Sequence, residues 1–256
     1  MSTRAMLHTW HALLLREALT RLFHRRAAWA WLLLEPAFHI SFMIFVFTQI
    51  RVRTVGGIDT VIWLALGFLG YFFFRRTADQ TGNAVGANRS LFTYRQVKPV
   101  DAVMVRAMLE GVLMLCVTAV VLLAVGLLGH PVLPARPLMI VEAALGLWAL
   151  GLGFGLIVSV AKEMVDELGN LVDMLMTPMY LISGVILPLS SVPPPLREWL
   201  MYNPVAHGLE ALRLGFADYY HAAPELSISY LYGWSLALLF FGLSLHVRFR
   251  HRLVSR

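Results

Sequence analysis

Six long apolar segments dominate this 256-residue chain and limit what it can fold into. An apolar segment of roughly 20 residues crosses a bilayer as a helix, because a backbone in hydrocarbon must satisfy its own hydrogen bonds. The period-two alternation of a membrane β-barrel is absent. With 59% hydrophobic and only 14% charged residues, we predict an all-α, polytopic membrane protein. Its six spans should cover residues 28–50, 58–74, 102–129, 137–161, 170–187 and 226–247.

The positions of lysine and arginine predict the orientation. Sixteen of the 21 lie in the N-terminal segment, the second-to-third connection, the fourth-to-fifth turn and the C-terminal tail, and five lie on the other side. Because positive charge is retained in the cytoplasm, both termini should be cytoplasmic. The net charge of +6 is then mainly a topology signal, and we expect no nucleic-acid binding.

The chain reads as one transmembrane domain, residues 1–256, with polar regions at its ends and before the last span. Residues 1–27 should form an amphipathic helix at the cytoplasmic membrane surface, although a basic flank that only orients the first span is an open alternative. Residues 188–225 are too short to span twice and too apolar to float free. We therefore expect two short re-entrant periplasmic helices there, and a cytoplasmic tail at residues 248–256.

No motif in the chain predicts an enzyme. The Gly-x-x-x-x-Gly-Lys-Ser/Thr phosphate loop, His-Glu-x-x-His and Gly-x-Ser-x-Gly do not occur, and no histidine has a second ligand at metal spacing. We therefore expect no catalytic residue, no metal site and no cofactor in this chain. If the protein performs ATP-driven work, a partner must hydrolyse the ATP.

Charged side chains inside spans are costly and mark function by default. Glu35 lies beside Pro36 in the first span; a snorkelling side chain and a role in a polar pathway are both open. Arg106 and Glu110 lie four residues apart near the cytoplasmic boundary, so we expect them to pair with each other.

Two polar stretches lie outside the spans. "NRSLFTYRQVKPVDA", residues 88–102, carries four charged residues and Pro99, which interrupts any helix passing through. After the fifth span, Asn203 and Pro204 are typical of a helix start, and three polar residues then recur at every third position. For these three, His207, Glu210 and Arg213, we favour pairing over contact with a transported molecule.

Several stretches, in order, resemble one family. They are LLLEPAFH, NRSLFTYRQVKPVDAVMVRAMLE and SGVILPLSSVPPPLREWLMYNPVAHGLEALR. With the N-terminal helix, these resemble the permease subunit of the ABC transporters that export capsular polysaccharide in Gram-negative bacteria, within the ABC-2 type exporter superfamily. The most specific pieces are Gln96-Val97-Lys98-Pro99 with Asp101, and Asn203-Pro204 with His207 and Glu210.

The resemblance implies a multi-pass homodimer in the bacterial inner membrane, with one cytoplasmic ABC ATPase subunit bound to each permease. ATP and Mg would lie on that ATPase. The cargo would be a phospholipid-linked polysaccharide, passed to a periplasmic polysaccharide co-polymerase-type adaptor and an outer-membrane exporter.

The resemblance also assigns roles to residues. A coupling helix within residues 75–101 would bind the ATPase, using Asn88, Leu91, Phe92, Tyr94, Arg95, Val97, Lys98, Pro99 and Asp101. The first and fifth spans would line the path, with Trp31, Glu35, His39, Asp173, Tyr180 and Ser183. The helices after the fifth span would cap the periplasmic exit, with Trp199, Asn203, Pro204, His207, Glu210 and Arg213. Arg25 and Arg26 could receive the lipid phosphate of the cargo, although plain positive-inside anchoring is equally open.

Other interpretations stay open. The chain could be a related ABC-2 permease for another lipid-linked glycan, such as an O-antigen or teichoic acid, although Val97-Lys98-Pro99 favours capsule. A secondary transporter would show inverted repeats, and none is visible. A membrane enzyme acting on lipid-linked sugars would need a paired acid-base or metal site facing one leaflet, which is missing.

Overall fold

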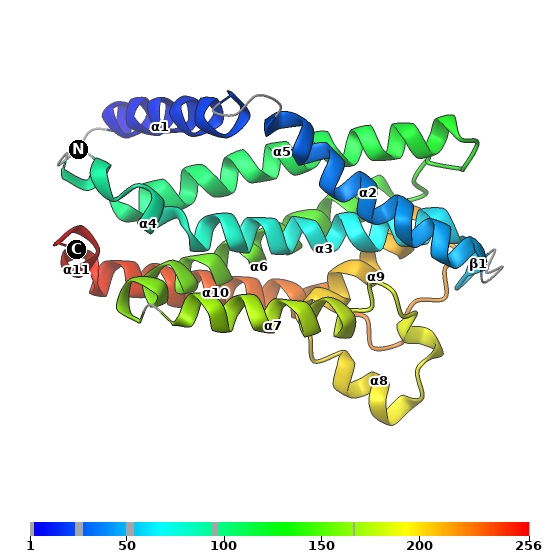
Figure 1. Cartoon of the computed structure of the whole chain (residues 1–256). Helices are drawn as coiled ribbons and strands as arrows, with labels where there is room; N and C mark the ends of the chain where they lie inside the picture. The colour runs from blue at the N-terminus through cyan, green and yellow to red at the C-terminus, as the bar shows by residue number, and fades with distance from the viewer. Residues whose placement is uncertain (1–2, 24–27, 50–53, 94–96, 166, 256) are drawn as a thin grey trace.

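The computed structural model describes residues 3–23, 28–49, 54–93, 97–165 and 167–255. Long helices lie side by side in a bundle (Figure 1). They are α1 (Thr3–Phe23), α2 (Ala28–Gln49), α3 (Thr60–Gly82), α5 (Pro99–Leu127), α6 (Pro137–Met164), α7 (Leu168–Ile182) and α10 (Ile228–Arg248). The shorter elements are β1 (Thr54–Val55), β2 (Ile58–Asp59), α4 (Ala84–Ala87), the 3-10 helices η1 (Arg89–Thr93) and η2 (Leu189–Ser191), α8 (Pro194–Leu200), α9 (Pro204–Phe216) and α11 (Arg250–Ser255).

Each of the six predicted spans falls on a helix. Among the described residues, four helices are long and apolar enough to cross a membrane: α3, α5, α6 and α10. The 15 residues of α7 extend about 22 Å at 1.5 Å per residue, short of a roughly 30 Å hydrocarbon core. In α2 the described apolar part is Leu34–Phe47. The structure thus supports a multi-pass helical membrane protein, and the number six stays a prediction.

The helix α3 forms the centre of the bundle. From Thr60 to Phe74 it is buried on all sides, and it packs against α2, α5, α6 and α9, as expected for a helix surrounded by others. Asp59 caps it by accepting hydrogen bonds from the backbone N–H groups of Val61 and Ile62. The helix continues to Gly82, so residues 75–82, predicted as part of the coupling segment, extend a span helix instead.

A small hairpin interrupts the otherwise helical fold. Strands β1 and β2 pair antiparallel through Gly56 and Gly57, whose φ angles are 57° and 93°. A two-residue turn with positive φ at both positions matches the twist of a hairpin, and glycine adopts these angles without steric cost. These two short strands are an exception to the predicted all-α fold. The backbone N–H of His221 donates a hydrogen bond to Gly56 O in the turn.

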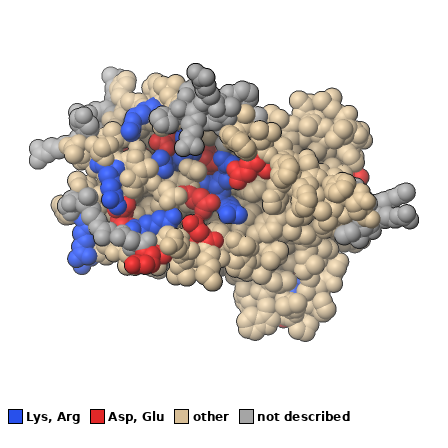
Figure 2. All heavy atoms as spheres, in the orientation of Figure 1, with Lys and Arg blue, Asp and Glu red and all other residues tan. Residues whose placement is uncertain are grey.

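The two ends of the bundle differ. Both chain termini lie at one end with α4 and α11, which we call the terminal end; the hairpin, α8 and α9 lie toward the other, which we call the hairpin end (Figure 1). On the face drawn in Figure 2, acidic and basic side chains gather over the half nearer the termini, and the other half is almost free of them.

Helix α1 runs beside the first turns of α5 in the same direction, since Trp10, Glu17 and Arg21 contact successively later residues of α5. Its polar side faces α5, and the exposed side carries Leu15 and Leu19. This helix also exposes His11, Arg16 and Thr20, so its amphipathic character stays a prediction. Its placement at a membrane surface stays a prediction.

Candidate functional site

In the segment of residues 84–101, at the terminal end, the described parts 84–93 and 97–101 are held by three helices. Arg16 of α1 donates to Asn88 Oδ1 at 3.1 Å, and Arg89 donates to Glu163 Oε2 of α6 at 2.7 Å. Phe92 is 4% exposed and lies in an apolar cluster with residues of α5 and α6. The segment is thus joined to the bundle by a hydrogen bond, an ion pair and apolar packing.

Asp101 fixes the place where α5 begins. Its Oδ2 accepts from Lys98 N at 3.0 Å, which closes the first turn, and its Oδ1 accepts from Trp10 Nε1 of α1 at 2.9 Å. Pro99 occupies the first helical position, where its missing N–H costs nothing. The predicted break at Pro99 is therefore the start of α5.

Four of the nine predicted coupling residues are buried inside this segment. Asn88, Phe92, Pro99 and Asp101 are buried, Leu91 and Val97 are half-buried, and Lys98 is exposed. Tyr94 and Arg95 lie outside the described residues. The single predicted coupling helix is replaced by two short elements, α4 and η1. A partner would contact the exposed side chains of Lys98 and Arg89. The buried residues would not touch the partner and would contribute by maintaining the shape of the segment.

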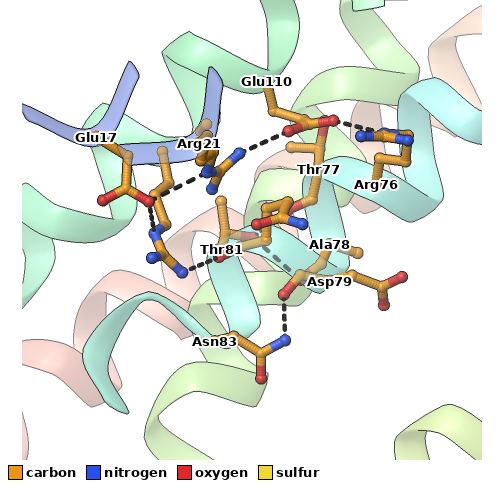
Figure 3. Close-up of polar contacts among 12 residues, drawn as sticks. Glu17, Arg21, Arg76, Thr77, Ala78, Asp79, Thr81, Asn83 and Glu110 are labelled. Carbon is orange, nitrogen blue, oxygen red and sulfur yellow. Dashed lines mark hydrogen bonds and ion pairs between the residues drawn. The ribbon is translucent and has the colours of Figure 1, made fainter. Parts of the chain in front are cut away.

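A network of charges joins four helices beside this segment, and Figure 3 shows its part on α1, α3 and α5. Glu110 of α5 has a fully buried side chain, and it accepts from Arg21 Nη1 of α1 at 2.8 Å and from Arg76 Nε of α3 at 2.7 Å. Arg76 also reaches Glu35 Oε2 of α2 at 3.1 Å. Glu17 of α1 pairs with Arg21. Removing one partner from a buried ion pair leaves an uncompensated charge, so the network holds these helices in register.

The predicted pair between Arg106 and Glu110 is wrong. Arg106 pairs with Glu17 of α1, and Glu110 is taken by Arg21 and Arg76. Neighbouring positions on one helix stabilise it by only about 0.2–0.5 kcal/mol when paired. Helices α1 and α3 pack against this face of α5 and supply partners for both residues. Spacing along one helix cannot reveal such partners, because they lie far away in the sequence.

Three of the predicted path residues come close to the central helix or to α9. His39 Nε2 of α2 lies 3.3 Å from Tyr180 OH of α7, and the His39 ring packs edge-on against Phe68. Ser183 Oγ at the end of α7 accepts from Asn203 Nδ2 at 2.8 Å. Trp31 and Asp173 are exposed. Arg25 and Arg26 lie outside the described residues.

A second buried pair lies at the hairpin end. Arg213 of α9, 0% exposed, donates to Gly184 O at 2.9 Å and to Val185 O at 3.1 Å, just beyond the end of α7. Its guanidinium lies 3.8 Å over the Trp63 ring and pairs with Glu210 at 3.2 Å. Arg213 therefore closes the end of α7 and connects it to the centre of the bundle.

The other residues predicted at this end are mainly internal. His207 Nε2 donates to Met201 O at 2.7 Å, and its Nδ1 accepts from Ser227 N at 3.0 Å. These bonds need a neutral ring, and burial lowers the pKa of His207. Asn203 caps α9 through Val205 N, and Pro204 takes the first helical position. Trp199, on α8, is exposed.

Tyr220 completes the hairpin-end site. Its hydroxyl donates to Glu210 Oε1 at 2.9 Å, and Glu210 Oε2 accepts from Ala223 N at 2.9 Å. Burial raises the pKa of Tyr220 to about 12, so it remains a donor at physiological pH. The carboxylate is thus satisfied by a guanidinium, a phenol and a backbone amide.

Sequence reasoning missed several members of both sites, above all Glu17, Arg21, Arg76, Trp63 and Tyr220. One signal was available: Glu17 and Arg21 are four residues apart on a predicted helix. Arg76 counted only as a topology charge. Nothing local marks Trp63 or Tyr220, because both contact residues far away in the sequence.

Together, the fold and these sites define a multi-pass helical membrane protein with a polar segment fastened at one end of its bundle. The sequence profile described as "ABC-2 type transporter" matches residues 8–217, and the chain belongs to this family.

Curated relatives extend the likeness over nearly the whole chain. The polysialic acid transport protein KpsM of Escherichia coli is 32% identical over 238 residues, 93% of this chain and 92% of the relative. The capsule polysaccharide export inner-membrane protein CtrC of Neisseria meningitidis is 25% identical, covering 93% and 89%. BexB of Haemophilus influenzae, which has the same description, is 26% identical, covering 91% and 88%.

Proposed function

We propose that this chain is the permease subunit of an ATP-driven exporter that moves lipid-linked capsular polysaccharide from the cytoplasm to the periplasm. The likeness to KpsM, at 32% identity over 93% of this chain, carries the proposal. CtrC and BexB, named for capsule polysaccharide export, match a similar share of the chain. The chain is accordingly a transport subunit of the inner membrane.

A separate cytoplasmic ATPase, holding ATP and Mg, is the second part of the proposal. The chain has no phosphate loop of its own. The segment of residues 84–101 gives an ATPase a surface to bind, with Lys98 and Arg89 exposed. Because the segment is fastened to α1 and α6 and continues into α5, a displacement of the segment moves packed helices as bodies.

The charge network extends this connection to the path. Arg16 binds the segment, Arg21 of the same helix binds Glu110, and Arg76 joins Glu110 to Glu35 of α2. Every step is a direct contact. We infer that motion at the segment reaches α2 through this network, and that Glu110 is the residue through which α1 and α3 act together.

A homodimer would form the path. Helices α2 and α7 expose apolar side chains, among them Phe38, Phe42, Leu175 and Leu181. Large exposed apolar faces are covered by lipid or by a partner. We assign these faces to the dimer interface, with Trp31, Glu35, His39, Asp173, Tyr180 and Ser183 along the path and Arg25 and Arg26 at the cytoplasmic entrance.

The difference between the two ends of the bundle supports an orientation in the membrane. Both termini lie at the charged end, which supports a cytoplasmic terminal end and a periplasmic hairpin end. In this orientation α8 and α9 would be the re-entrant helices at the exit. The exported glycan would then pass to a periplasmic adaptor and an outer-membrane exporter.

Co-purification with the ATPase encoded beside this chain, followed by reconstitution into vesicles, tests the proposal. Lipid-terminated capsular polysaccharide should stimulate ATP turnover, and lipid-linked O-antigen should stimulate it less. Equal stimulation by O-antigen would replace capsule with another lipid-linked glycan. Failure to bind any ATPase would contradict the ATP-driven part of the proposal.

The docking surface has its own control. Lys98→Glu should weaken binding of the ATPase, whereas Arg136→Glu, an exposed charge paired with Asp218 toward the hairpin end, should leave binding unchanged. Both variants are compared at equal amounts of membrane-inserted protein. Normal ATPase binding by Lys98→Glu would remove this surface from the proposal.

A further inference from the structure

A long apolar groove lies between α5 and α6, with α3 as its floor. Helix α3 packs extensively against both helices, whereas α5 and α6 touch each other far less. They meet where Trp148 Nε1 of α6 donates to Ala107 O of α5 at 2.8 Å. Further toward the hairpin end the helices separate and leave a groove of about 620 Å³.

The lining of the groove excludes most ligand classes. Leu69 and Phe73 form part of the floor, and Phe216 of α9 closes the groove toward the hairpin end. Among the residues that the structure describes, no charged one lines it. Apart from the Trp148 indole, the polar side chain in the lining is Thr118, whose Oγ1 is buried and makes no hydrogen bond within the described structure. A sugar, a nucleotide or an ion would find no partner here.

The mouth of the groove faces the side of the bundle that would meet hydrocarbon. Val112 and Leu115 of α5 and Val141 and Leu145 of α6 line it, and each is more than half exposed. Both helices are candidate membrane spans. Water needs polar partners that this groove lacks, and empty space would forfeit dispersion contacts along its walls. The occupant must be apolar and must come from the membrane.

The length of the groove narrows the choice. From Met108 to Leu122 the wall on α5 covers 14 residue steps, about 21 Å along the helix axis. One leaflet contributes about half of a roughly 30 Å hydrocarbon core. A single acyl chain of that leaflet, extended along the helix axis, therefore fits within the length of the groove. We propose that this groove binds one acyl chain of a bilayer phospholipid, which fills the space between α5 and α6.

This site is independent of the transported glycan and of any ATPase. Because the lining carries no charge, recognition is of the chain and not of the headgroup. The acyl chain would replace the side-to-side packing that α5 and α6 lack. Removing the acyl chain should therefore loosen the packing of α5, the helix that begins within the segment of residues 84–101.

Trp148 lines the groove and provides the readout. The full chain is reconstituted in phospholipid nanodiscs with brominated acyl chains, and the emission due to Trp148 is taken as the difference from Trp148→Phe. Brominated chains should quench this emission equally with phosphatidylethanolamine and phosphatidylglycerol headgroups. Ala144→Phe, which fills the groove, should abolish most of the quenching. The matched change Ala119→Phe, at an exposed position of α5 outside the groove, should preserve it.

Equal quenching in Ala144→Phe and Ala119→Phe, or none in the wild type, would overturn the proposal. If Ala144→Phe does not fold, Thr118→Val keeps the shape and removes only the unpaired hydroxyl. Native mass spectrometry should then show a phospholipid retained more firmly than in the wild type. Weaker retention would mean that a polar occupant fills the groove. Cross-linking between copies through Val112→Cys would mean that a second chain covers it.

Discussion

A fully buried glutamate meets arginine at each end of the bundle, but the two sites are built differently. At the hairpin end, Glu210 and Arg213 lie three residues apart on one helix, and Arg213 is itself 0% exposed. At the terminal end, Glu110 is bound by arginines from two other helices, and their side chains remain 18% exposed. The first site connects α9 to the end of α7 and to Trp63 with its charged groups closed off from water. The second joins separate helices through arginines that water can still reach.

The difference indicates where each end can move. Breaking the hairpin-end pair would expose nothing and leave a charge buried, so that site should stay closed in the working protein. The terminal-end network ends at Glu35, whose side chain is 68% exposed. A contact of this kind can exchange with water at little cost. We therefore place motion at the terminal end and anchoring at the hairpin end.

The largest expected effect comes from Arg213→Met. This change leaves Glu210 buried without its guanidinium and the end of α7 without its donors. We expect a loss of about 3–5 kcal/mol of folding free energy, seen as loss of folded protein in detergent. Exposed Arg252→Met on α11 serves as the control. Wild-type stability of Arg213→Met would contradict the anchoring role.

A smaller loss is expected from Glu110→Gln. The side chain keeps its shape and loses the charge that binds Arg21 and Arg76, whose partial exposure lets water compensate. We expect about 1–3 kcal/mol and faster proteolysis within α1, because Arg21 loses its partner on α5. Glu142→Gln, at an exposed position of α6, is the matched control. Unchanged protection of α1 would show that the network does not hold this helix.

Acid should lower the stability of the hairpin end through His207. Burial lowers the pKa of His207, so the folded state binds fewer protons at this site than the unfolded chain. Stability should be constant above the unfolded pKa of about 6.5 and should fall as the pH drops below it. Thermal unfolding between pH 5 and 8 measures this slope, and His207→Gln should reduce it. An identical slope in the variant would assign the acid sensitivity to another group.

The smallest effect on stability should come from Glu35→Gln. The exposed pair with Arg76 contributes about 0–1 kcal/mol, while Arg76 keeps Glu110. Thermal unfolding should therefore barely change. Reconstituted export per ATP hydrolysed should fall, since the network loses its contact with α2. If Glu35→Gln is unstable, or if it exports normally, the proposed role of Glu35 in transmitting motion is wrong.

Much of the fold followed from local pattern. Apolar runs predicted a helix at each span, and Pro99 and Asn203-Pro204 marked the starts of α5 and α9 as expected. The hairpin at Gly56 and Gly57 had a local signal that was not used. In these cases the physical cause lies within a few neighbouring residues.

The sites were predicted less well because their causes are distant in sequence. Arg21 and Glu110 are 89 positions apart, and Arg213 reaches carbonyls 28 and 29 positions away. Spacing on one helix suggested the pair between Arg106 and Glu110, and tertiary packing supplied other partners. The resemblance assigned Phe92 to the coupling helix, and its burial inside the segment depends on helices α5 and α6, which lie further along the chain.

We propose that the terminal-end network transmits motion from the segment of residues 84–101, where an ATPase would bind, to the path. The most direct measurement is ATP turnover by the reconstituted permease–ATPase complex, with and without lipid-terminated capsular polysaccharide, in Glu110→Gln and in Glu142→Gln. We predict that Glu110→Gln binds the ATPase normally but loses the stimulation by polysaccharide, while Glu142→Gln retains it. Full stimulation in a correctly assembled Glu110→Gln complex would contradict the claim.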